Sequence, residues 1–169
     1  MIGAFVDGLT QFFLPTHLLA VVALGLLAGQ DAKRFPVAAV AAYAFGLAAG
    51  SVLIAAAVRE QNTGPVLLAV AALAGIAVAI ARPVPRAVQA LSACLTGGAV
   101  ALNTPPQAIT IPSAVAAQTG AAIAAFAMLT IVVMIGMRAR GAWHRIGLRV
   151  VGSWIAASAV LVLALRLAR

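Results

Sequence analysis

The stretch "QFFLPTHLLAVVALGLLAGQ" (residues 11–30) is almost entirely apolar, with a single histidine, His17, near its beginning. A helix needs roughly 20 apolar residues to cross a hydrocarbon core about 30 Å thick. Backbone N–H and C=O groups cannot stay unpaired in lipid, so an apolar run of this length must be helical there. The stretch therefore predicts a membrane-spanning helix over residues 12–29.

Five further apolar runs follow along the chain, and 64% of its 169 residues are hydrophobic while 8% are charged. Soluble domains are only about 45–50% apolar, and the alternating pattern of a membrane barrel is absent. The fourth run is the weakest, so a partly buried or re-entrant segment stays open there. We expect an all-α, polytopic integral membrane helix bundle of about six transmembrane helices in one domain, 1–169, the other runs being 36–58, 65–82, 86–102, 114–137 and 146–165.

The net charge of +8 is unevenly distributed between the links that join these runs. Basic links stay in the cytoplasm, which places both termini and the links at 59–64 and 103–113 on the outer side of a bacterial inner membrane. The basic residues then serve to orient the chain in the membrane, and we expect no nucleic-acid partner. The expected partner is the lipid bilayer. Other membrane subunits are also compatible with this arrangement. The first, third and fifth links carry 8 of the 11 basic residues: Lys33, Arg34, Arg82, Arg86, Arg138, Arg140, Arg145 and Arg149.

Chemically reactive side chains are scarce. The three acids, Asp7, Asp31 and Glu60, fall at or beyond the ends of the predicted helices, and Cys94 is the one cysteine. A lone cysteine excludes an internal disulfide and a cysteine metal cluster. Acid–base pairs and activated nucleophiles also lack the residues they need. We therefore expect neither an enzyme nor a resident cofactor.

His17 has two interpretations, and the sequence leaves both open. It lies about five residues into the first run, roughly 7–8 Å along a helix that rises 1.5 Å per residue, hence near the outer surface. Imidazole is a ligand for first-row metal ions, with Asp7 as a weak second candidate on the same side. Alternatively, His17 is a polar residue that bonds to neighbouring helices or to water.

The link "NTPPQAITIPS" (residues 103–113) also has two interpretations. Its three prolines break helical structure on both sides of an apolar-leaning stretch. A plain external loop explains this pattern. Non-helical backbone at membrane depth is tolerated where it lines a cavity, and in that case Asn103, Gln107, Thr110 and Gln118 would line a vestibule beside His17.

Two other signals are explained by membrane placement alone. In "GLAAG", Gly46 and Gly50 are four residues apart, a small-xxx-small spacing that favours close helix packing. His144 lies in "RARGAWHR", where a tryptophan and basic residues are typical of the membrane surface. Neither signal indicates chemistry.

The segments "HLLAVVALGLLAGQ", "GLAAG", "PPQ" and "RIGLRVVGSWIAASAVLVLAL" together resemble the HupE/UreJ family of bacterial membrane proteins across nearly the whole chain. Members are associated with hydrogenase or urease and act as nickel, sometimes cobalt, permeases. The resemblance implies a nickel permease or nickel-enzyme accessory protein, with Ni²⁺ as transported cargo.

The family's first-helix signature, H-P-x-x-G-x-D-H, is only partly present. Aligned on its last histidine, this chain has Thr10, Gln11, Leu14 and Thr16 at the other four positions and keeps His17. A divalent ion leaving water needs several nitrogen or oxygen donors. Two possibilities follow: a sparse pathway built from carbonyl and hydroxyl groups, or a scaffold that no longer transports and serves as a structural or accessory subunit of a larger membrane complex.

Overall fold

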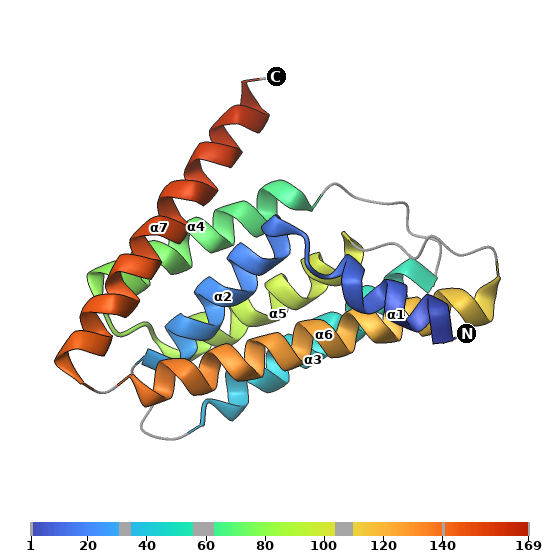
Figure 1. The fold of residues 1–169 in the computed structure, drawn as a ribbon, viewed down its shortest axis with the longest axis horizontal. Helices are drawn as coiled ribbons and strands as arrows, with labels where there is room; N and C mark the ends of the chain where they lie inside the picture. Colours follow the sequence, from blue (N-terminus) through green and yellow to red (C-terminus); the bar gives the residue numbers. More distant parts are fainter. Residues whose placement is uncertain (1, 31–34, 56–62, 104–109, 140, 169) are drawn as a thin grey trace.

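The computed structural model describes residues 2–30, 35–55, 63–103, 110–139 and 141–168, which form helices joined by short turns (Figure 1). The all-α prediction is confirmed. The helices are α1 (Ile2–Gln11), α2 (Pro15–Gln30), α3 (Val37–Ala55), α4 (Gly64–Ile80), α5 (Arg86–Leu102), α6 (Ile111–Arg138) and α7 (Ala142–Leu167).

Five of the predicted runs coincide with helices α3 to α7 to within a few residues. The run 86–102 has the same bounds as α5, whereas α6 and α7 each begin earlier than predicted. Thr110 explains the start of α6, because its side-chain oxygen accepts a hydrogen bond from the backbone N–H of Ser113 at 3.4 Å. The last predicted residues of the second run, 56–58, lie outside the described residues.

The run predicted over 12–29 matches α2 to within a few residues, but the sequence did not predict the helix that precedes it. The structure begins α2 at Pro15 and places a separate helix, α1, before it, with a bend of 69° between the two. Proline has no N–H to donate and favours the first turn of a helix. Before it, the N–H of Phe13 donates to the carbonyl of Thr10 at 3.1 Å, which closes the end of α1.

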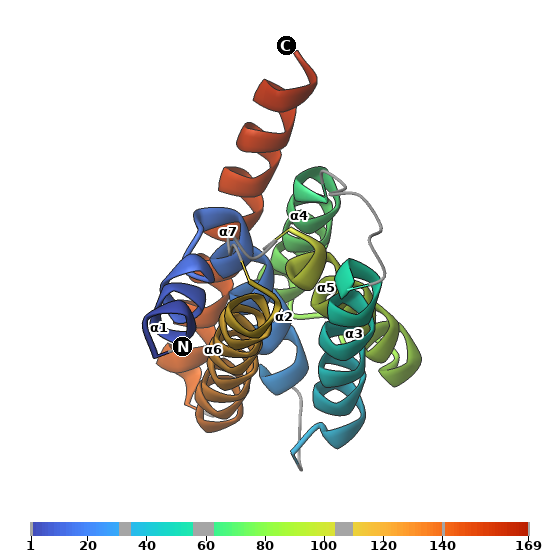
Figure 2. The same cartoon turned by 90° about the vertical axis from the view of Figure 1, so that its right-hand side faces the viewer.

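Helix α2 lies at the centre of the bundle and contacts α4, α5, α6 and α7 (Figure 2). Most of its residues from Ala20 to Gly29 are buried, so α2 has no broad face left for lipid. A helix that is apolar all round is typical of such an interior position. The other principal pairs are α3 with α5, α4 with α7, and α1 with α6.

Glycines allow several of these pairs to approach closely. Gly46 and Gly50 of α3 face α5, where a Cβ on Gly50 would lie 2.8 Å from the carbonyl oxygen of Gly98 and one on Gly46 would collide with the carbonyl of Cys94. Lipid supplies no hydrophobic driving force between helices, so close van der Waals contact has to hold them together. Small residues are therefore required at this contact.

Helices α3, α6 and α7 are each long and apolar enough to cross a membrane, and the bent pair α1–α2 adds a fourth span if the two are counted together. Helices α4 and α5 are shorter apolar helices of 17 residues each. By length and composition, the chain is a multi-span helical membrane protein. The last turns of α7 project beyond the other helices (Figure 1).

Candidate functional site

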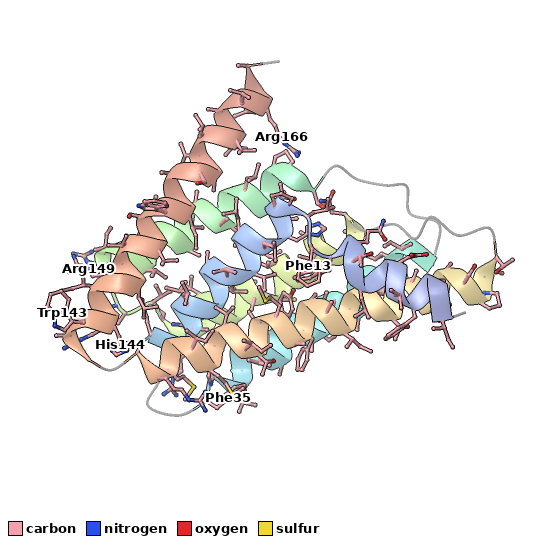
Figure 3. The ribbon with its side chains drawn as sticks, in the orientation of Figure 1. Phe13, Phe35, Trp143, His144, Arg149 and Arg166 are labelled. Atoms are coloured by element: carbon pink, nitrogen blue, oxygen red, sulfur yellow. The ribbon has the colours of Figure 1, made fainter. Side chains whose placement is uncertain are left out.

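The His17 side chain lies in the first turn of α2 and is fully buried, with 0% of its surface exposed. Its Nδ1 is 3.3 Å from the carbonyl oxygen of Phe12, and its Nε2 is 3.0 Å from the side-chain nitrogen of Asn103. The ring of Phe12 stacks on the imidazole with their centroids 6.1 Å apart. The expectation of an imidazole close to water is therefore wrong, because the ring is enclosed in protein. Phe13, which follows Phe12 in the turn before α2, is labelled in Figure 3.

These two contacts select one protonation form of His17. The Asn103 amide nitrogen can only donate, so Nε2 accepts and Nδ1 carries the proton that is donated to Phe12. A neutral imidazole therefore satisfies both ring nitrogens. A metal-binding histidine commonly has the same arrangement, with one N–H held by a backbone carbonyl and the other nitrogen left with its lone pair.

Asn103 is positioned by the end of α5 and the beginning of α4. Its N–H donates to the carbonyl of Ala99 at 3.1 Å, and the same carbonyl accepts a hydrogen bond from the hydroxyl of Thr63 at 2.8 Å. Thr63 directly precedes α4, so α2, α4 and α5 meet around His17. Thr63 and Phe12 were not predicted from the sequence. The available signal for Thr63 was its place before Gly64 and Pro65, where a helix begins.

The other candidate residues have different surroundings. Thr110 is exposed and caps α6, and Asp7 is exposed within α1, so the expectation that Asp7 lies at or beyond a helix end is wrong. Asp7 lies in the middle of α1 because this helix continues to Gln11. Gln118 donates from Nε2 to the hydroxyl of Ser51 on α3 at 3.2 Å. Gln107 lies outside the described residues. Among the three expected vestibule residues that the structure describes, Asn103 forms a hydrogen bond with the imidazole.

A second group of polar atoms lies inside the helix bundle. The Tyr43 hydroxyl and the Gln118 Oε1 are buried and have no hydrogen-bond partner within the part of the chain that the structure describes. Buried polar groups in proteins are nearly always hydrogen-bonded to protein or water, so these two atoms are exceptions to that rule within the described residues. Tyr43 was also missed, although the chain's single tyrosine in the middle of an apolar run was a visible signal.

No group of three or more His, Cys, Asp or Glu side chains that could hold a metal ion occurs within the described ranges. A divalent ion at Nε2 of His17 would therefore take one imidazole nitrogen together with neutral oxygen donors.

The bundle and its buried His17–Asn103 pair define the class: a multi-span helical membrane protein with a neutral polar site where three helices meet. Comparison of the chain with protein-family models, curated proteins and solved structures found no match.

Proposed function

We propose that this chain is a divergent HupE/UreJ-type membrane protein that acts as a permease for nickel or cobalt ions or in nickel-enzyme maturation. The observation that carries the proposal is the His17–Asn103 pair, in which Nδ1 lies 3.3 Å from the Phe12 carbonyl oxygen and Nε2 lies 3.0 Å from the side-chain amide nitrogen of Asn103. Rotation of that amide by half a turn would withdraw the donor and present its oxygen beside Nε2. One imidazole nitrogen and one amide oxygen would then face the ion together.

Ion passage requires donors that bind strongly enough to replace water and weakly enough to release the ion. Asn103 and Gln118 supply neutral amide groups, and Tyr43 supplies a hydroxyl deeper in the bundle. Asp7 is the one carboxylate among the residues that the structure describes, and it is exposed. Neutral donors suit movement down a gradient, which a membrane potential favours by about 2.3 kcal/mol per charge at 100 mV.

The proposed topology has six spans with both termini on the outer side. It is supported by the alternating direction of the helices: α2, α4 and α6 end where α3, α5 and α7 begin (Figure 1). That end carries Arg82, Arg86, Arg138 and Arg145, as the positive-inside rule expects of a cytoplasmic face. His17, at the start of α2, then lies toward the outer side.

Uptake of labelled nickel by cells that express the chain tests the permease. We expect accumulation above that of cells with an empty vector, and a parallel measurement with labelled cobalt identifies the preferred ion. Accumulation equal to the empty-vector control at every micromolar concentration would reject transport.

The second candidate function is a non-transporting subunit of a larger membrane complex, and α7 favours it. Only 22% of its most apolar 18-residue window is buried within the protein, against 44% for α6. Trp154, Leu161 and Leu165 form part of the exposed surface, which suits another membrane helix as well as lipid. Purification of a stoichiometric partner after mild detergent extraction, together with absent nickel uptake, would establish this function instead.

A further inference from the structure

Two cavities adjoin the C-terminal end of α6, and Arg138 lines both of them. The first has a volume of about 520 Å³ and lies against the beginning of α7; the second, of about 440 Å³, lies on the side of Phe35. Arg138 is exposed between them. The remaining lining residues are Ile135, Ala139, Trp143, His144, Gly147 and Leu148 in the first cavity, and Met134, Phe35 and Met137 in the second.

We propose that this corner binds the headgroup of an anionic phospholipid, with the phosphate at the Arg138 guanidinium and an acyl chain along the apolar wall of the first cavity. The inference does not depend on nickel transport. Arginine recognises phosphate with paired N–H donors, and basic pockets between membrane helices bind anionic headgroups.

The charges around the corner favour an anion. Arg145 and Arg149 follow on α7, and Figure 3 shows Arg149 at the same end of the molecule as Trp143 and His144. Arg149 donates from Nε to the carbonyl of Ala79 at 2.8 Å. Asp7, the carboxylate that the described ranges contain, lies in α1 near the other end of α6. No described acid therefore competes for Arg138.

The apolar residues favour a lipid over free phosphate. Ile135 and Leu148 lie about one turn deeper into α6 and α7 than Arg138 and His144, so the cavity continues from a basic rim to an apolar wall. Trp143 is 85% exposed at this rim. Tryptophan favours the membrane surface because its ring has an apolar body and one N–H donor.

Quenching of Trp143 fluorescence in vesicles tests the proposal, with Trp154→Phe introduced so that Trp143 is the only tryptophan. The vesicles contain phosphatidylcholine with a minor fraction of phosphatidylglycerol, and bromine is placed on the acyl chains of one lipid or the other. We expect brominated phosphatidylglycerol to quench more than its share of the lipid predicts. Quenching by each brominated lipid in proportion to its share of the vesicle overturns the proposal.

Arg138→Gln should lower the apparent affinity for phosphatidylglycerol about fivefold, as loss of one basic residue near the surface implies, while Arg138→Lys retains part of the preference. Arg166→Gln, at the far end of α7 in Figure 3, is the matched control and should change nothing. An unchanged preference in Arg138→Gln overturns the proposal.

A second variant tests the cavity without altering charge. A Cβ at Gly147 meets nothing within 4 Å, and Gly147 lines the first cavity, so the side chain of Gly147→Leu should occupy part of that cavity and reduce quenching by brominated phosphatidylglycerol. Unaltered quenching in this variant, with helical content equal to that of wild type, contradicts the cavity as the site. Inorganic phosphate should fail to displace the lipid; displacement by phosphate alone would reject the phospholipid.

Discussion

The side-chain nitrogen of Asn103 lies 3.0 Å from Nε2 of His17, although the two residues are 86 positions apart in the sequence. This contact joins the first turn of α2 to the end of α5. Because the Phe12 carbonyl holds the other ring nitrogen, the orientation of the imidazole is fixed from both sides. Asn103 is also the residue from which the chain enters the link to α6.

The His17–Asn103 contact predicts that the two side chains stabilise the fold together. A double-mutant cycle with His17→Ala, Asn103→Ala and the double variant should give a coupling free energy on the order of 1 kcal/mol, as expected for one buried hydrogen bond. The free energy of unfolding in detergent is the quantity to measure. Strict additivity of the two single variants would show that the contact is absent in the folded protein.

Gly46→Ala should destabilise the contact between α3 and α5 by about 1–3 kcal/mol, the usual cost of overfilling a packed interior. The added methyl group would meet the backbone carbonyl of Cys94, which cannot turn aside as a side chain can. Gly98→Ala is the control at the same contact, because its Cβ would lie an ordinary 3.6 Å from the carbonyl oxygen of Gly46. Equal thermal midpoints for the two variants would argue against this packing.

The proposed topology predicts opposite accessibility at the two ends of the bundle. In a Cys94→Ala background, a cysteine at Ile2, which is 84% exposed, should react with a membrane-impermeant maleimide added to intact cells. A cysteine at Trp143, which is 85% exposed, should react only after the membrane is opened. Labelling of the Trp143→Cys variant from outside would reverse the orientation.

Hydropathy was sufficient to predict α3 to α7, because each contains an apolar run near the length of a membrane span. The spacing of Gly46 and Gly50 likewise indicated a close helix contact, and the structure places both glycines against α5. These features depend on local sequence alone, so no long-range information was needed.

Helix α1 could not be predicted in the same way. Its sequence contains Gly3, Gly8 and Asp7, which are poor helix formers. The helix is held by tertiary packing on α6, where Gly8 lies against the backbone of Ala117. Contacts of this kind depend on a partner more than one hundred residues away, which the sequence of α1 does not identify.

The surroundings of the site were predictable only in part. One interpretation of the link 103–113 predicted that Asn103 and Gln118 both lie beside His17. Asn103, at the end of α5, does reach the imidazole, whereas Gln118 of α6 donates to Ser51 of α3. Which helix face meets which neighbour is decided by the packing of the whole bundle. The full burial of His17 has the same origin, since the turn at Phe12 and the end of α5 at Asn103 both cover it.

In the proposed permease, His17 is the first nitrogen donor that an entering nickel ion meets. The direct test of this role is nickel accumulation per amount of folded protein in the membrane. Normalisation is needed because removal of a fully buried, hydrogen-bonded imidazole should cost about 1–3 kcal/mol of stability. His144, exposed at the other end of the bundle, provides the control. We predict that His17→Ala accumulates no more nickel than the empty-vector control while His144→Ala matches the wild type. Equal accumulation by all three proteins would contradict the claim.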